Sequence, residues 1–141
     1  VAQIALGANP AQAVKAITEA EAYPGPSLII GYAPCELHGI AKGGMNHCQD
    51  EMKKAVAAGY WNLFSFNPQL KAEGKNPFTI DSKQPVTEEY RNFLLNEARY
   101  SSLTRSFPER AEKLFSEAEV KSVERYEHLL RLKDLYAPKA D

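Results

Sequence analysis

Residues 27–39 read SLIIGYAPCELHG and contain the clearest strand signal in the chain. The run from Leu28 to Tyr32 is apolar on both sides, which is typical of a strand covered on both faces of a parallel sheet. Proline and glycine are frequent after Tyr32, so the strand is expected to end there. Cys35 follows at once. We therefore expect an α/β fold in which Cys35 lies at the carboxyl edge of a sheet, where ligands of such folds bind.

The elements on either side of this strand alternate between strand and helix. Upstream, VAQIAL at 1–6 predicts a strand, and Asn9 and Pro10 are a good N-cap and first-turn pair for a helix over 10–22. Downstream, a helix is expected over 46–58, and YWNLFSF at 60–66 predicts a third strand. This alternation with short connections predicts right-handed βαβαβ units over residues 1–66, and hence a partial doubly wound parallel sheet.

The remaining residues follow a different pattern. Residues 67–86 are polar, carry three prolines and have no regular period, so we expect an extended arm that lies over a neighbour. Residues 87–141 predict a C-terminal helical tail, with a break near 106–108. The last helix, from about 108 to 135, would be roughly 40 Å long at 1.5 Å per residue. Such a helix is too long to be covered by this small sheet alone.

Composition excludes several classes of function. The chain has 141 residues and a formal net charge of −1, so it offers no electrostatic reason to bind nucleic acid or an acidic membrane surface. No apolar stretch approaches the roughly 20 residues that cross a bilayer, and the first residues do not resemble a signal peptide. We therefore expect a cytoplasmic protein. The two cysteines are too few for a disulfide framework.

Four side chains that can bind zinc lie close together in the sequence, namely Cys35, His38, His47 and Cys48. Their spacing, C-x2-H-x8-H-C, is not a standard zinc-finger pattern. A single cysteine after a strand is more often a small apolar residue than a ligand. A Cys–His dyad would need an orienting group and an oxyanion site that the sequence does not reveal. The residues alone thus leave open a free-standing zinc or thiol protein and a non-catalytic helical interaction module.

Four blocks narrow these alternatives: GPSLIIGYAPCELHGIAKGGM (25–45), VAAGYWNLFSFNP (56–68), GKNPFTIDSKQP (74–85) and RYSSLTRSFPERAEKLF (99–115). In this order and at this spacing, the chain resembles the C-terminal part of pyruvate:ferredoxin (flavodoxin) oxidoreductase. The resemblance extends from Val1 to about Leu130. It implies a domain of the thiamine-diphosphate-binding type whose N-terminal half is missing, and the abrupt first strand agrees with sequence missing upstream.

The resemblance also implies an activity and a site. The family oxidatively decarboxylates pyruvate with coenzyme A to acetyl-CoA and CO2, and it passes electrons through iron–sulfur clusters to ferredoxin or flavodoxin. Cys35 matches the family's fourth ligand of the 4Fe-4S cluster nearest the thiamine. The other three cysteines and the residues for magnesium and thiamine diphosphate would lie upstream, so this chain alone is expected to be inactive.

The expected partners are therefore the rest of the same polypeptide or another subunit, within a homodimeric enzyme. Cys48 does not match a ligand position of the family. Glu36 would place a negative charge beside the cluster, which would lower the cluster's potential if the side chain points that way.

Overall fold

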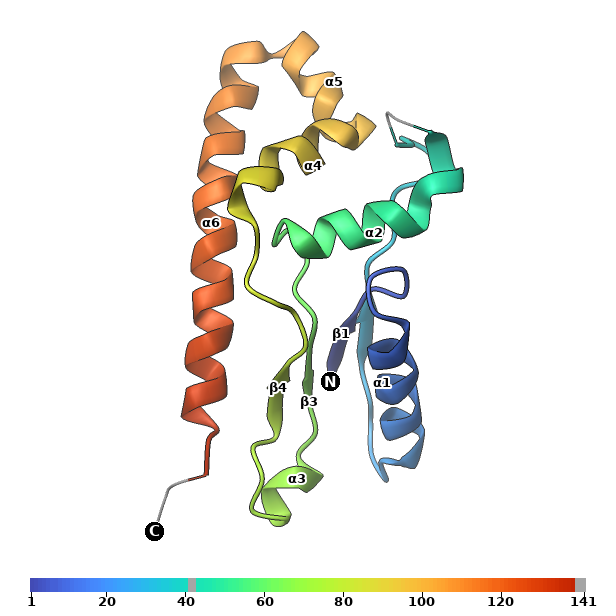
Figure 1. Cartoon of the computed structure of the whole chain (residues 1–141), viewed down its shortest axis with the longest axis vertical. Helices are drawn as coiled ribbons and strands as arrows, with labels where there is room; N and C mark the ends of the chain where they lie inside the picture. The colour runs from blue at the N-terminus through green and yellow to red at the C-terminus, as the bar shows by residue number, and fades with distance from the viewer. Residues whose placement is uncertain (41–42, 139–141) are drawn as a thin grey trace.

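The computed structural model describes residues 1–40 and 43–138, which fold into a four-stranded mixed sheet with helices beside it and beyond its end (Figure 1). The strand order is β2-β1-β3-β4. The strands are short: β1 is Ala2–Ile4, β2 is Ile29–Gly31, β3 is Phe64–Phe66 and β4 is Phe78–Ile80. These elements confirm the predicted α/β class. Residues 41–42 of the predicted βαβαβ segment and residues 139–141 of the predicted helical tail lie outside the described residues.

The prediction that all three strands of the first 66 residues run parallel is wrong. β1 and β2 are parallel, with Ala2 opposite Ile29, but β3 is antiparallel to β1, with Gln3 opposite Phe64. The reason is the position of α2, Cys48–Ala57, which lies across the carboxyl ends of β1 and β2 and does not return along the sheet (Figure 1). The chain therefore enters β3 from that end and must run in the opposite direction.

The first helix and the last helix have the predicted bounds. α1 is Pro10–Ala22, and the side chain of its N-cap Asn9 accepts a hydrogen bond from the backbone N–H of Gln12 at 3.0 Å. α6 is Pro108–Leu135. The helix expected over 46–58 is a 3-10 turn, Gly44–His47, followed by α2. The chain leaves α2 through Gly59, whose φ of 78° is a conformation that favours glycine.

The segment 67–86 is not extended throughout. It contains a helical turn, α3, at Gln69–Ala72, and its strand β4 pairs antiparallel with β3, with Ser65 opposite Thr79. Beyond it the chain forms a 3-10 turn, Thr87–Glu89, and then α4, Tyr90–Asn96, and α5, Ala98–Ser106. The helical tail then turns back along the sheet as α6, beside β4 (Figure 1).

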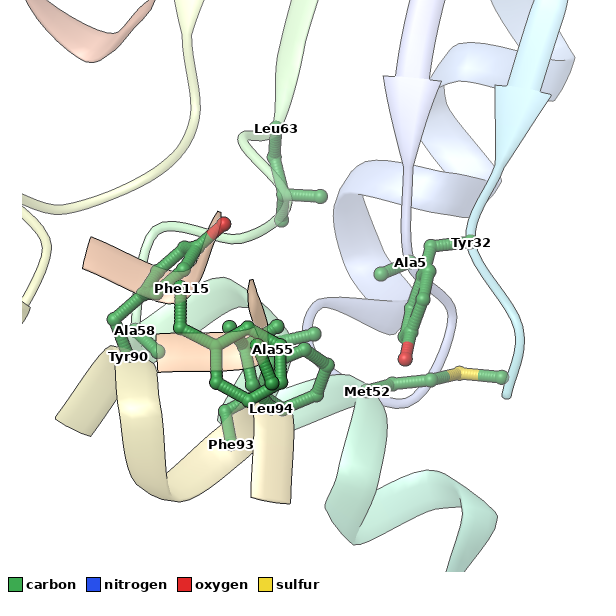
Figure 2. Packing of buried hydrophobic residues seen from close by; sticks show 11 residues of the cluster. Ala5, Tyr32, Met52, Ala55, Ala58, Leu63, Tyr90, Phe93, Leu94 and Phe115 are labelled. Carbon is green, nitrogen blue, oxygen red and sulfur yellow. The ribbon is translucent and has the colours of Figure 1, made fainter. Parts of the chain in front are cut away.

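The apolar core does not lie on the sheet at β2. β2 is an edge strand, and Ile30 within it and Leu28 just before it are 41% and 55% exposed. The described residues therefore leave one face of β2 open, although cover on both faces was expected. The main core lies instead beyond the strand ends, where α2, α4 and α6 meet (Figure 2).

Within residues 1–40 and 43–138, no helix combines the length and the apolar character needed to cross a membrane.

Candidate functional site

Cys35 lies in a tight turn that follows the end of β2, and we call residues 32–40 the Cys35 loop. The backbone N–H of Tyr32 donates to the carbonyl of Ile4 at 3.0 Å, so the loop leaves the sheet at a defined point. The backbone N–H of Gly39 then donates to the carbonyl of Cys35 at 2.8 Å, and Gly39 has a φ of 75°. The structure thus confirms that Cys35 follows the carboxyl end of β2.

The Cys35 thiol is partly exposed and has hydrogen-bonding partners within its own loop. Its Sγ lies 3.0 Å from Nδ1 of His38. This contact, with help from the backbone N–H groups of His38 and Leu37, holds the pKa of the Cys35 thiol below its ordinary value. Because the thiolate is the form that binds metals and attacks electrophiles, the loop favours the reactive form.

Leu37, two residues after Cys35, is unusually exposed for a large apolar side chain. The side chain of Leu37 is 90% exposed, although it is large and apolar. An isolated exposed leucine is ordinary on a protein surface. Here it lies two residues after Cys35, in the same loop.

Of the other predicted zinc ligands, His38 contacts Cys35, whereas His47 and Cys48 do not join them in a metal-binding group. His47 ends the 3-10 turn, and its Nδ1 lies 3.6 Å from a carboxylate oxygen of Asp50. Cys48 is the first residue of α2 and is partly buried. Across the described residues, no group of three or more His, Cys, Asp and Glu side chains could hold a metal ion. The four-ligand zinc hypothesis therefore has no support from this geometry.

The donor set at Cys35 fits one ligand position of an iron–sulfur cluster. Such clusters are bound by cysteine thiolates, and hydrogen bonds to sulfur tune them. Cys35 has a soft sulfur donor, a lowered pKa and neighbouring N–H groups. A four-iron cluster takes four ligands, whereas the sequence has two cysteines. At least two thiolate ligands of an all-cysteine cluster would therefore have to come from residues outside this chain.

Sequence reasoning missed Glu97, which lies directly behind the Cys35 loop. This side chain is fully buried, and its Oε1 accepts a hydrogen bond of 2.7 Å from the hydroxyl of Tyr32. The sequence does contain a signal for it. Glu97 comes four residues after Phe93 and three after Leu94, so on one continuous helix its charged side chain would fall on the apolar face. A charged residue is rarely buried without a partner.

Known proteins with similar sequences were compared with the chain. No protein-family model matches it. The chain is 54% identical to a pyruvate:ferredoxin oxidoreductase of Moorella thermoacetica and 51% identical to a pyruvate-flavodoxin oxidoreductase of Klebsiella pneumoniae, in each case over 132 residues. It is also 47% identical, over 109 residues, to a mitochondrial pyruvate dehydrogenase [NADP(+)] of Euglena gracilis.

These matches cover most of this chain but little of each relative. They include 94% of the chain for the first two proteins and 77% for the third. The chain spans 11% of the length of the first two relatives and 6% of the third. The chain is thus a homologue of one segment of the pyruvate:ferredoxin and pyruvate-flavodoxin oxidoreductases.

Proposed function

We propose that the chain is the C-terminal part of a pyruvate:ferredoxin (flavodoxin) oxidoreductase and that Cys35 supplies one ligand of a 4Fe-4S cluster. The observation that carries this proposal is the activated Cys35 thiol at the carboxyl end of β2. The identity of 51–54% to proteins named as pyruvate oxidoreductases supports the reaction class. The names of those relatives specify ferredoxin or flavodoxin, and we propose one of these as the electron acceptor.

The whole protein would decarboxylate pyruvate oxidatively, with coenzyme A as the acyl acceptor and with acetyl-CoA and CO2 as products. Thiamine diphosphate and magnesium would be held by residues outside this chain. Those residues and the four-stranded sheet of this chain would together form one thiamine-diphosphate-binding domain. A bound cluster supplies a site that accepts and releases single electrons. We further propose that the enzyme is a homodimer, as the resemblance to the family implies.

The residues of this chain would have four roles toward such a cluster. Cys35 would provide a sulfur ligand, and His38 would stabilise the thiolate through its contact at 3.0 Å. The backbone N–H groups of Leu37 and His38 would donate toward the sulfur and fix its direction. Leu37, which is 90% exposed in this chain, would be covered by the other residues that enclose the cluster and would help to exclude water.

The test is the substitution Cys35→Ala in the intact protein that contains this chain. We expect the iron content to fall and the electron paramagnetic resonance signal of one reduced cluster to disappear, because that cluster has lost a ligand. Cys48→Ala is the matched control, since Cys48 is also a partly buried free cysteine but lies on α2. Full iron content and unchanged electron transfer in the Cys35→Ala protein would refute the assignment.

A further inference from the structure

Glu97 occupies the break between α4 and α5, where the backbone is extended with φ −83° and ψ 115°. Its side chain is completely buried. The hydroxyl of Tyr32 donates to Oε1 at 2.7 Å, and Nε of Arg99 lies 3.5 Å from Oε2 without forming a hydrogen bond to it. A buried charge that loses its partner is strongly destabilising. The Tyr32 hydroxyl is therefore a contact that Glu97 requires.

The same residue contacts both ends of the Cys35 loop. Tyr32, the first residue of the loop, binds the Glu97 side chain. Ile40, the last residue of the loop, pairs with the Glu97 backbone in an antiparallel bridge, and the adjoining N–H of Ala98 donates to the carbonyl of Gly39 at 3.2 Å. The loop that carries Cys35 is thus held at its beginning and at its end by one position of the helical tail.

The surroundings of Tyr32 keep this connection in one arrangement. Burial, followed by the hydrogen bond to Glu97 and the charge of Glu97, raises the pKa of Tyr32 well above its ordinary value, so the phenol stays a proton donor. The ring of Tyr32 packs against aromatic residues, with centroid distances of 5.8 Å to Tyr60, 5.8 Å to Trp61 and 6.4 Å to Phe93. The hydroxyl therefore has little freedom to turn away from Glu97.

We propose that Glu97 is a positioning residue for Cys35, and that it sets the place and direction of the thiol through Tyr32 and the backbone bridge to Ile40. The inference rests on the proposed function, because it assigns to the helical tail a role in holding the cluster ligand. A ligand must be held within a fraction of an ångström of its productive position, and supporting residues around the ligand provide that precision. Glu97 supplies it from more than sixty residues away in the sequence.

The test uses Tyr32→Phe in the intact, iron-loaded protein, because this change removes one oxygen atom and retains the packed ring. We expect an altered electron paramagnetic resonance line shape of the cluster that Cys35 binds. We also expect the loss of iron to a chelator to accelerate on the order of tenfold, as for the loss of a hydrogen bond to a charged group. Glu97→Ala should have the same effects, whereas Glu97→Gln should restore most of the behaviour, since its amide oxygen can still accept from Tyr32.

Tyr100→Phe is the matched control. It also removes one hydroxyl from a hydrogen-bonded pair in the aromatic cluster, because the hydroxyls of Tyr60 and Tyr100 lie 2.7 Å apart. That pair does not include a residue of the Cys35 loop, so the line shape and the rate of iron loss should stay as in the parent protein. A second measurement, alkylation of Cys35 in protein stripped of iron, should show a changed rate in Tyr32→Phe and an unchanged rate in Tyr100→Phe.

The possible failures are distinguishable. A cluster that survives Cys35→Ala would overturn the proposed function itself. A cluster that needs Cys35, but has the same line shape, iron loss and alkylation rate in Tyr32→Phe, Glu97→Ala and Tyr100→Phe, would overturn the positioning role and leave the proposed function intact.

Discussion

Phe93 connects α4 to the aromatic cluster under the Cys35 loop, and its truncation should be one of the most destabilising single changes in this chain. The side chain is 2% exposed, and its ring centroid lies 4.7 Å from that of Tyr60. Phe93→Ala removes this ring from a core that cannot fully collapse around the space, and such changes cost about 3–5 kcal/mol. Because small domains are stable by only about 5–15 kcal/mol, the loss is a large part of the total.

The assay is urea unfolding followed by the fluorescence of Trp61, which is the sole tryptophan of the chain. Trp61 is a suitable reporter because its indole N–H donates to the carbonyl of Ile4 at 2.9 Å and so responds to the junction between β1 and the core. Leu95→Ala is the control, since Leu95 lies on the same helix but is 40% exposed. It should cost about 1 kcal/mol or less. Equal losses for Phe93→Ala and Leu95→Ala would refute the assigned core.

Two further substitutions test the turn after α2 and the polar contacts of α1. Gly59→Ala should lower the free energy of unfolding by about 1–3 kcal/mol more than Gly74→Ala. Both glycines have positive φ, but only a Cβ at Gly59 would lie within 2.8 Å of the Pro85 ring. Urea unfolding of both variants measures the difference, and equal losses would contradict the prediction. Burial raises the pKa of Asp81 above its ordinary value of 3.8, although Gln12 donates to its carboxylate at 3.4 Å. The charged form of Asp81 is thus disfavoured in the folded state. The parent protein should therefore gain stability relative to Asp81→Asn as the pH falls from neutrality through the raised pKa toward 3.8. A stability difference between the two proteins that does not change with pH would contradict this prediction.

Local sequence signals predicted several elements correctly. The Asn9-Pro10 pair marked the start of α1, and the apolar period over 108–135 marked α6 at its observed bounds. The position of Cys35 behind β2 also followed from the sequence, because an apolar run that ends in proline and glycine defines its own end. These features depend on residues a few positions apart, and short-range patterns are sufficient to predict them.

The direction of β3 could not be predicted from short-range patterns. An apolar run such as YWNLFSF has the same pattern whether the strand runs parallel or antiparallel to its neighbour. The choice depends on whether the preceding helix returns along the sheet or crosses the strand ends, as α2 does (Figure 1). Similarly, the polar segment 67–86 has no alternation typical of a strand. β4 forms there because the free edge of β3 provides backbone groups that it can pair with.

The candidate site shows the same division between local and distant information. The sequence identified Cys35 and its neighbour His38, since both lie in one turn of the chain. It did not identify the connection between Tyr32 and Glu97, because residues 65 positions apart meet only when α4 and α5 fold back over the Cys35 loop. The family resemblance singled out the thiol among the local candidates. Its surroundings depend on long-range packing, which brings a buried carboxylate to a hydroxyl that can satisfy it.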